Sequence, residues 1–428
     1  MKIEAEGCLF VTIACHLLWL VREGSIKKGT HMTTAEIKAW ATEYIMNTYG
    51  DRQLAFVKGE GAYVWSADGK KYLDFLSGIA VNGLGHCHPK VVSAIQNQAE
   101  KLLHVSNLYY IEPQAQLAKL LVENGDLDQC FFCNSGAEAN EAAIKIARKF
   151  VKDSGRPKAN EIITMNQSFH GRTMATISAT AQPKYHKGFE PMLPGFVYVP
   201  YNDLDAVESA INENTCAILV EPIQSEGGVN VPSSGYLAGL RDLCDRNELV
   251  LIFDEVQTSP ARLGTFFGYQ SWGITPDVIT MAKSLGGGTP IGAMMATRSV
   301  AESFVPGTHA ATFGGNPLVT AAATATLETI LEEDICQNAT EMGNYMVNTF
   351  SKLKERYPLT DIRGRGLLRG LVFSIDAKPL AAKCADNGLI TICTNDHVLR
   401  FLPPLNIGKQ QIDEAYQLLE KSLADVGL

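Results

Sequence analysis

The chain has little of what a nucleic-acid partner or a bilayer would require. Its 37 Lys and Arg are outnumbered by 46 Asp and Glu, which gives a formal net charge of −9, whereas phosphate backbones are bound by clustered basic side chains. Beyond the first 31 residues, no apolar run approaches the length of a membrane-spanning helix. We therefore expect neither a nucleic-acid partner nor a membrane association.

Cysteine is present, but without the spacing of a metal site. The ten cysteines follow no repeat, and the C-x-x-C pair formed by Cys130 and Cys133 has no second pair at zinc-like spacing. We therefore expect no bound metal. Most of the thiols are expected to be small buried apolar groups in a reducing compartment, which favours a cytoplasmic location.

Nucleotide-binding signatures are also missing. No G-x-G-x-x-G opens a helix after a first strand, and no G-x-x-x-x-G-K-[ST] occurs in the chain. These absences disfavour a nucleotide-dependent α/β enzyme, even though the chain contains several glycine-rich loops.

What the chain does have is the composition of a folded enzyme: 428 residues, 46% hydrophobic and 19% charged. This length allows two sizeable domains. Residues 1–31 differ from the rest, because their apolar run over residues 8–21 is too short for a comfortable membrane span and lacks a basic start. We interpret residues 1–31 as a leader or a non-native extension, with Met32 as the native start.

Hydrophobic periodicity predicts an α/β protein. Residues 34–47 have the pattern of a helix capped by Thr33 or Thr34, and two alternating segments on either side of Asp68-Gly69 are typical of a hairpin. Short apolar strands then alternate with amphipathic helices. The strands are predicted at residues 129–133, 161–165, 216–220, 250–253 and 278–281, and this alternation indicates a largely parallel sheet.

The same pattern suggests how the domains are organised. A large domain is expected over residues 86–325, and an Ala/Thr/Leu-rich helix over residues 318–331 leads out of it. A smaller α+β domain follows over residues 326–428, with strands near 371–375 and 398–402. Residues 32–85 are expected to contribute to this smaller domain.

Polar groups follow three of the predicted strands, where ligands bind in open α/β sheets. Residues 134–140 combine small side chains with a helix start, whose backbone N–H groups attract anions; alone, this stretch could be an ordinary capped turn. Asp254 follows a buried strand, a costly position unless a cation or a protonated ring nitrogen meets the carboxylate. A structural ion pair or a metal ligand would also explain Asp254.

The third of these groups is Lys283, which is followed by Ser284 and a run of glycines. An amine in this position suits attack on a carbonyl carbon, because burial lowers its pKa and frees the nitrogen lone pair. A solvated surface lysine is the simpler explanation for most lysines considered singly. An anion cradle, a carboxylate and a lysine in this order, each at a strand end, nevertheless favour a catalytic site.

Longer motifs give the chain a resemblance to a known family. They are FCNSGAEANEAAIK from Phe132, FHGRT from Phe169, EPIQ from Glu221, FDEVQT from Phe253, AKSLGGG from Ala282 and TFGGNP from Thr312. From about Tyr49 onwards, the chain resembles the class III aminotransferases of fold type I, and within them the branch that acts on N-acetylornithine. The resemblance implies pyridoxal 5'-phosphate as cofactor and a mostly parallel seven-stranded sheet in a large domain, with a smaller α+β domain.

The resemblance also implies roles for individual residues. Lys283 would hold the cofactor covalently and move a proton between substrate and cofactor, while Asp254 would pair with the pyridinium nitrogen. The other contacts would come from Ser135, Gly136 and Ala137 at the phosphate, Phe169 and Val256 on the two ring faces, and Gln257 at the phenolic oxygen. Core packing alone would also account for Phe169 and Val256. Thr312 would complete the phosphate site of a second subunit, which implies a homodimer.

Two arginines are implied to bind substrate carboxylates, a task for which a planar fork is better suited than an ammonium group. Arg172 would clamp the amino donor, helped by Tyr49, and Arg400 would hold the α-carboxylate of glutamate or 2-oxoglutarate. Glu226 would pair with Arg400 when the bound substrate has no carboxylate at that end. A surface salt bridge would be the simpler explanation of Arg400.

The implied reaction transfers the δ-amino group of N-acetylornithine to 2-oxoglutarate, giving N-acetylglutamate 5-semialdehyde and glutamate in arginine biosynthesis. Ornithine, succinylornithine, acetyllysine and 4-aminobutyrate are alternative donors, and a non-catalytic binding protein is a disfavoured alternative. Ile79 favours an acylated amine, because ornithine aminotransferases tend to carry a tyrosine there that could bond a free α-amino group. Two features depart from the family pattern and could reshape the substrate entrance. Ser225 stands where the family usually has glycine, and the segment 259–264 replaces a commonly glycine-richer segment.

Overall fold

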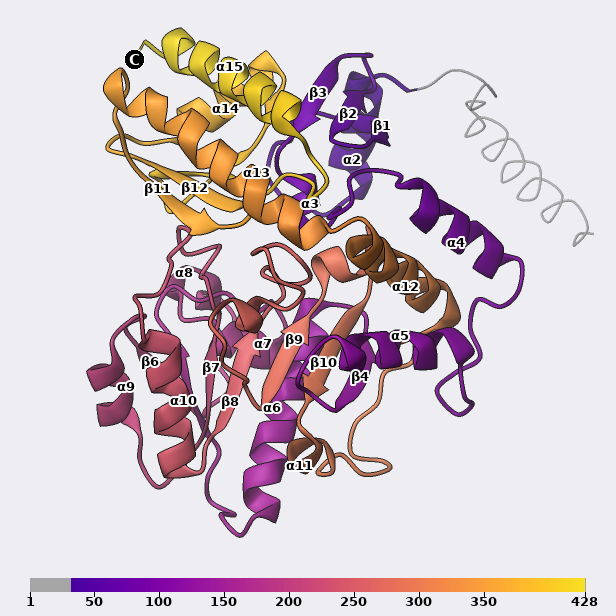
Figure 1. The fold of residues 1–428 in the computed structure, drawn as a ribbon, viewed down its shortest axis with the longest axis vertical. Coiled ribbons are helices and arrows are strands. Elements are labelled where there is room, and N and C mark those ends of the chain that lie inside the picture. Colours follow the sequence, from indigo (N-terminus) through magenta and orange to yellow (C-terminus); the bar gives the residue numbers. More distant parts are fainter. Residues whose placement is uncertain (1–31, 428) are drawn as a thin grey trace, which may run out of the picture. The chain divides into compact units, whose positions relative to one another are not determined.

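The computed structural model describes residues 32–427, so the proposed leader over residues 1–31 lies outside the described residues. The described chain divides into two compact units, one of residues 32–58 and 65–70 and the other of residues 59–64 and 71–427. Both are drawn in Figure 1. The domain boundaries expected from the sequence stay predictions.

The smaller unit contains helix α2 (Thr34–Tyr44). Its predicted cap is confirmed, because the Glu36 N–H donates to Thr33 Oγ1 at 3.3 Å and the Thr33 N–H donates to the Glu36 carboxylate at 2.8 Å. This reciprocal pattern is a capping box. The helix ends earlier than predicted, since Ile45 adopts an extended backbone conformation.

A turn at Asp68-Gly69 separates β2 (Tyr63–Ser66) from β3 (Lys71–Asp74), as the sequence predicts. The Gly69 N–H donates to Ser66 O at 2.9 Å within this turn, and Gly69 has a φ of 84°. A positive φ favours glycine, which has no Cβ to clash with the backbone. The strand β1 (Phe56–Glu60) precedes β2 in the chain.

The larger unit contains a seven-stranded sheet in the order β4-β10-β9-β8-β7-β5-β6. β10 runs antiparallel to both of its neighbours, while β9, β8, β7, β5 and β6 run parallel to one another. The strands are β4 (Gln129–Cys133), β5 (Glu161–Met165), β6 (Phe196–Val199), β7 (Thr215–Val220), β8 (Val250–Asp254), β9 (Val278–Met281) and β10 (Gly292–Ala296). The mostly parallel seven-stranded sheet is thus confirmed. β6 and β10 are not among the strands that the sequence predicts, and β10 lacks the β-branched residues that favour strands.

Helices cover this sheet, and α6 (Gly136–Asp153) packs across β7, β8, β9 and β10 (Figure 1). The predicted helix after Pro317 is confirmed as α12 (Pro317–Glu332), which packs against α4 and α5. The remaining helices and turns of this region are α4 (Pro89–Ala99), α5 (Glu112–Glu123), α7 (Met174–Ala179), α8 (Pro183–His186), α9 (Leu204–Ala210), α10 (Tyr236–Asn247), α11 (Arg298–Ala301), η1 (Gly268–Ser271) and η2 (Lys283–Gly286). Across residues 32–427, no helix combines the length and apolar character needed to cross a bilayer.

The C-terminal part of the larger unit is an α+β arrangement, as expected. Its antiparallel sheet has the order β11-β12-β15-β14 and lies beneath α13, α14 and α15 in Figure 1. The elements are α13 (Ile335–Phe350), η3 (Ser351–Glu355), β11 (Leu359–Arg365), β12 (Leu368–Phe373), α14 (Lys378–Asn387), β13 (Leu389–Ile390), β14 (Ile392–Thr394), β15 (Val398–Phe401) and α15 (Lys409–Asp425). β13 is not part of this sheet and pairs in parallel with β3. The central strand β15 carries Arg400, which is therefore anchored on both sides.

Candidate active site

A cavity of about 510 Å³ opens at the carboxyl ends of β4, β7, β8 and β9. The loops that follow these strands line it, together with residues 169–172 beyond β5. The sequence-predicted residues in its lining are Ser135, Gly136, Ala137, Phe169, Arg172, Glu226, Asp254, Val256, Gln257 and Lys283. The parallel sheet brings these residues together because it places successive strand ends along one edge.

The predicted anion cradle lies at the start of α6. Ser135 is the N-cap, and its Oγ accepts from the Glu138 N–H at 3.2 Å. The first N–H groups of a helix have no partner within it, so those of Gly136 and Ala137 are available to an anion. A Cβ at Gly136 would lie 2.8 Å from Val256 Cγ1. Glycine therefore allows the valine and the helix start to share one wall of the cavity.

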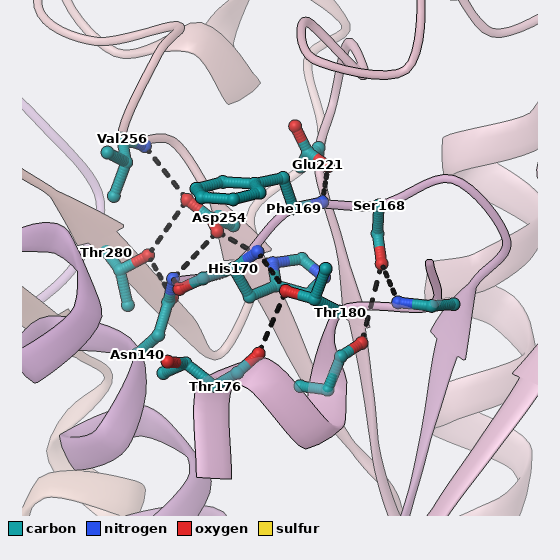
Figure 2. A network of polar contacts seen from close by, with 12 residues as sticks. Asn140, Ser168, Phe169, His170, Thr176, Thr180, Glu221, Asp254, Val256 and Thr280 are labelled. Atoms are coloured by element: carbon teal, nitrogen blue, oxygen red, sulfur yellow. Dashed lines mark hydrogen bonds and ion pairs between the residues drawn. The ribbon is translucent and has the colours of Figure 1, made fainter. Parts of the chain in front are cut away.

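Asp254, the last residue of β8, is held by the buried network shown in Figure 2. Its Oδ2 accepts from Asn140 Nδ2 at 2.8 Å and lies 2.7 Å from His170 Nδ1. Its Oδ1 accepts from the Val256 N–H at 3.1 Å, and Thr280 Oγ1 donates to Asn140 Oδ1 at 2.7 Å. Among the described residues, His170 Nε2 is buried without a hydrogen-bond partner.

The network fixes the orientation of the Asp254 carboxylate in the cavity wall. His170 and the Asn140 amide orient the carboxylate, and a protonated ring nitrogen in the cavity would form an ion pair with it. The sequence did not single out these two residues or Thr280. Asn140 and His170 lie within the quoted motifs, which were the only signal for them, and Thr280 lies inside a strand that gave no such signal.

A second buried acid, Glu221, lies in the same wall of the cavity. Burial raises the pKa of Glu221 well above its usual range, and the nearby Asp254 carboxylate raises it further. Glu221 Oε1 accepts from the Phe169 N–H at 2.8 Å, which fixes the backbone that carries the Phe169 ring. The raised pKa of Glu221 opposes a second negative charge beside Asp254.

Lys283 follows β9 and is half-buried in the cavity. Its φ of 40° is uncommon for a residue with a side chain, and such strain is found mainly at functional sites. Burial lowers the pKa of Lys283, although the carboxylates of Glu226 and Asp254 act in the opposite direction. The neighbouring Ser284 Oγ donates to Ala80 O at 2.7 Å and anchors the turn. The site therefore presents an amine whose neutral, nucleophilic form is favoured.

Arg400 lies behind Glu226 rather than in the cavity lining. Its Nη1 is 2.9 Å from Glu226 Oε1, and the two side chains are 1% and 25% exposed, respectively. Burial opposes ionisation of Glu226, but the charge and hydrogen bond of Arg400 outweigh it and lower the pKa of Glu226. Glu226 also accepts from Gln257 Nε2 at 3.0 Å. The carboxylate thus covers the guanidinium on its cavity side, which differs from the alternative of a surface salt bridge.

Arg172 is exposed at the cavity and is held by aromatic rings. Its guanidinium carbon lies 4.1 Å from the Tyr185 ring centre and 5.6 Å from the Phe169 ring centre. Among the described residues it forms no ion pair. A cation–π contact holds the guanidinium without using its N–H donors, so these stay available for a carboxylate.

Three of the singled-out residues are placed elsewhere. Thr312 is exposed and does not line the cavity of its own chain. Tyr49 is exposed in the smaller unit. Ile79 is half-buried on α3 (Ser77–Ala80), a turn in which all four residues have positive φ, and packs against an apolar cluster. Val81, which lines the cavity, follows this turn.

The geometry is that of an amine, a carboxylate and an anion cradle around one cavity, and the comparison with known proteins agrees with it. The family model of class-III aminotransferases matches residues 44–423. The chain belongs to the class-III aminotransferases. This family implies pyridoxal phosphate as the cofactor and an amino acid and 2-oxoglutarate as substrates.

Curated relatives of this class-III aminotransferase are similar over nearly their whole length. A protein of Methanocaldococcus jannaschii named acetylornithine aminotransferase is 47% identical over 385 residues, covering 90% of this chain and 97% of the relative. One of Nostoc sp. with the same name is 48% identical, covering 89% and 92%. The named relatives therefore match the large and the C-terminal parts of the chain alike.

Similar solved structures include aminotransferases named for ornithine and for N-acetylornithine. The ornithine aminotransferase of Toxoplasma gondii has a TM-score of 0.89 at 34% identity, covering 92% of this chain and 96% of its own. The N-acetylornithine aminotransferase of Stenotrophomonas maltophilia has a TM-score of 0.78 at 37% identity, covering 89% and 98%. Fold similarity therefore does not separate the two substrate classes.

Proposed function

We propose that this enzyme transfers the δ-amino group of N-acetylornithine to 2-oxoglutarate, with pyridoxal phosphate bound in the cavity described above. The observation that carries the proposal is the Arg400–Glu226 pair beside the Lys283 amine, because such a pair lets one cavity accept substrates of different charge. The relatives named acetylornithine aminotransferase, at 44% to 48% identity, support the choice of donor.

The cavity fits the cofactor that the family implies. When bound, pyridoxal phosphate supplies an electron sink for the bonds that change at the substrate carbon. The N–H groups of Gly136 and Ala137, with the Ser135 hydroxyl, would hold its phosphate, and Asp254 would hold its ring nitrogen in the protonated form. The residues Phe169 and Val256 would enclose the ring, and Gln257 would donate to the phenolic oxygen.

Lys283 would serve twice. Its amine would attach to the cofactor between turnovers and, once displaced by a substrate amine, would carry the proton that leaves the substrate carbon. Both tasks need an unprotonated nitrogen. Burial of Lys283 favours that form because it lowers the pKa of the amine.

Arg400 and Glu226 would sort the two substrates by charge. N-acetylornithine has no carboxylate next to its reacting amine. The ion pair between Arg400 and Glu226 would therefore remain intact and present no unpaired charge to this substrate. The α-carboxylate of 2-oxoglutarate would displace Glu226 and take the guanidinium fork in its place. The carboxylate at the far end of the donor would be held by Arg172.

The enzyme is proposed to act as a homodimer, because Thr312 is exposed outside the cavity of its own chain. In this arrangement Thr312 would complete the phosphate site of a second subunit. Exposed apolar side chains near it in sequence, such as Phe313 at 60% exposure, support a covered surface there.

The test is a substrate panel with the purified holoenzyme. Values of kcat/KM are measured for N-acetylornithine, ornithine, succinylornithine and 4-aminobutyrate, with 2-oxoglutarate as the common acceptor. We expect N-acetylornithine to exceed ornithine by about tenfold or more, a discrimination of about 1.4 kcal/mol. A preference for ornithine would instead support an ornithine aminotransferase, the activity named for the similar Toxoplasma gondii enzyme.

A further inference from the structure

Ser225 stands where the family usually has glycine, and its side chain is fully buried beside the cavity wall. Its Oγ accepts from Arg400 Nη1 at 3.0 Å and donates to Gln257 Oε1 at 3.1 Å. Gln257 Nε2 in turn donates to Glu226 Oε1, which is paired with the same Arg400 Nη1. Four side chains thus close a ring of polar contacts, in which the hydroxyl is both a donor and an acceptor.

The Ser225 backbone is fixed, whereas the Glu226 side chain has room to move. Gln224 and Asn230, on either side of the loop, exchange two backbone hydrogen bonds of 3.1 and 3.0 Å. The Glu226 side chain is 25% exposed and opens onto the cavity. When a substrate carboxylate displaces Glu226, the Ser225 hydroxyl therefore remains in place on Arg400 Nη1.

The guanidinium of Arg400 depends on this anchor. Within the described residues, Ser225 and Glu226 are the groups that contact its Nη1, and its Nε is buried without a hydrogen-bond partner. Once Glu226 has moved, Ser225 is the protein group that still orients the fork. A fork that is already oriented binds a carboxylate with a smaller loss of side-chain freedom.

We infer that Ser225 is a positioning residue for the dicarboxylate substrate: its hydroxyl holds the Arg400 guanidinium and the Gln257 amide in place while Glu226 moves aside. The inference rests on the proposed function, in which Arg400 binds the α-carboxylate of 2-oxoglutarate. It also accounts for a side chain at a position where glycine would leave the guanidinium with one fewer acceptor.

The test compares Ser225→Ala and Ser225→Cys in the holoenzyme. The probe is glutarate, a five-carbon dicarboxylate without a keto group, which cannot react; its dissociation constant is measured by calorimetry. We expect Ser225→Ala to weaken glutarate binding and to raise KM for the dicarboxylate substrate about tenfold, the effect of losing a hydrogen bond to a charged group. KM for N-acetylornithine should change less than about twofold, because its reacting end leaves Arg400 paired with Glu226.

Two comparisons keep the test decisive. Ser422→Ala removes a buried hydroxyl on α15, outside the cavity lining, and should leave glutarate binding unchanged. Ser225→Cys keeps the size of the side chain but offers only a weak donor and acceptor, so it should weaken glutarate binding severalfold. If Ser225→Ala does not fold, this variant alone tests the inference.

Equal losses for glutarate and N-acetylornithine, or unchanged glutarate binding in the Ser225 variants, would overturn the inference. Glutarate binding requires no amino donor. The comparison of glutarate affinities between the unaltered enzyme and the Ser225 variants is therefore valid even if the donor is not N-acetylornithine. Absence of glutarate binding in the unaltered enzyme would instead contradict the proposed carboxylate site of Arg400.

Discussion

Replacing Arg400 with methionine removes the guanidinium charge while keeping an unbranched side chain at a position that has no solvent exposure. In the proposed function the α-carboxylate of 2-oxoglutarate accepts two hydrogen bonds from this guanidinium. Each hydrogen bond to a charged group contributes about 1.5–3 kcal/mol. Their loss therefore amounts to about 3 kcal/mol or more, and kcat/KM for the dicarboxylate substrate should fall about a hundredfold or more.

The donor half-reaction provides the internal control for Arg400→Met. In the proposed function, N-acetylornithine binds while Glu226 covers the guanidinium, so its rate should change by less than about threefold. The two half-reactions are followed separately by single-turnover spectroscopy of the bound cofactor. Losses of equal size in both half-reactions would refute the proposal that Arg400 distinguishes the substrates.

Stability must be measured on the same variant, because Glu226 loses its cationic partner. Arg400 lowers the pKa of Glu226 against the effect of burial, so this pKa should rise in Arg400→Met. The Glu226 side chain is 25% exposed, and the cost should therefore lie below the roughly 3–5 kcal/mol seen when fully buried pairs are broken. Adding Glu226→Gln should recover most of the lost melting temperature.

Three further substitutions test the cofactor site. Lys283→Ala should lower turnover at least about a hundredfold, the scale of a lost general base, with an unchanged melting temperature. In the unaltered apo-protein, the rate at which pyridoxal phosphate binds covalently should rise with pH and reach its plateau below pH 10.5, because the lowered pKa of Lys283 gives the neutral amine at lower pH. Asp254→Asn should lower kcat about tenfold to a hundredfold, and an unchanged pH titration of the cofactor absorbance would contradict its pairing with the ring nitrogen. Gly136→Ala should weaken cofactor binding about tenfold, since its Cβ would lie 2.8 Å from Val256. Adding Val256→Ala should restore only part of the binding, because Val256 is also proposed to pack on the cofactor ring.

Much of the cofactor site could be predicted because it follows from local sequence. Asp254 and Lys283 each stand at the end of a short apolar strand, and the cradle at Gly136 begins a long helix. Strand and helix signals are short-range, and the parallel arrangement then requires these ends to share one edge of the sheet. The residues that orient Asp254 could not be derived in this way, since His170 resembles any buried histidine until its neighbours are known.

The sequence by itself determined the α/β class and the order in which the anion cradle, the carboxylate and the lysine follow one another along the chain, because periodicity and motifs are carried by neighbouring residues. The number of strands in the sheet came from the family resemblance, and their order in the sheet from the structure. Only the tertiary structure decided which distant side chains share hydrogen bonds. It places Arg400 of β15 against Glu226 and Ser225 of a loop after β7, and it joins Asn140, His170 and Asp254 in one buried network. Such contacts depend on distances of about 3 Å between groups far apart in the chain, which packing sets and no local pattern encodes.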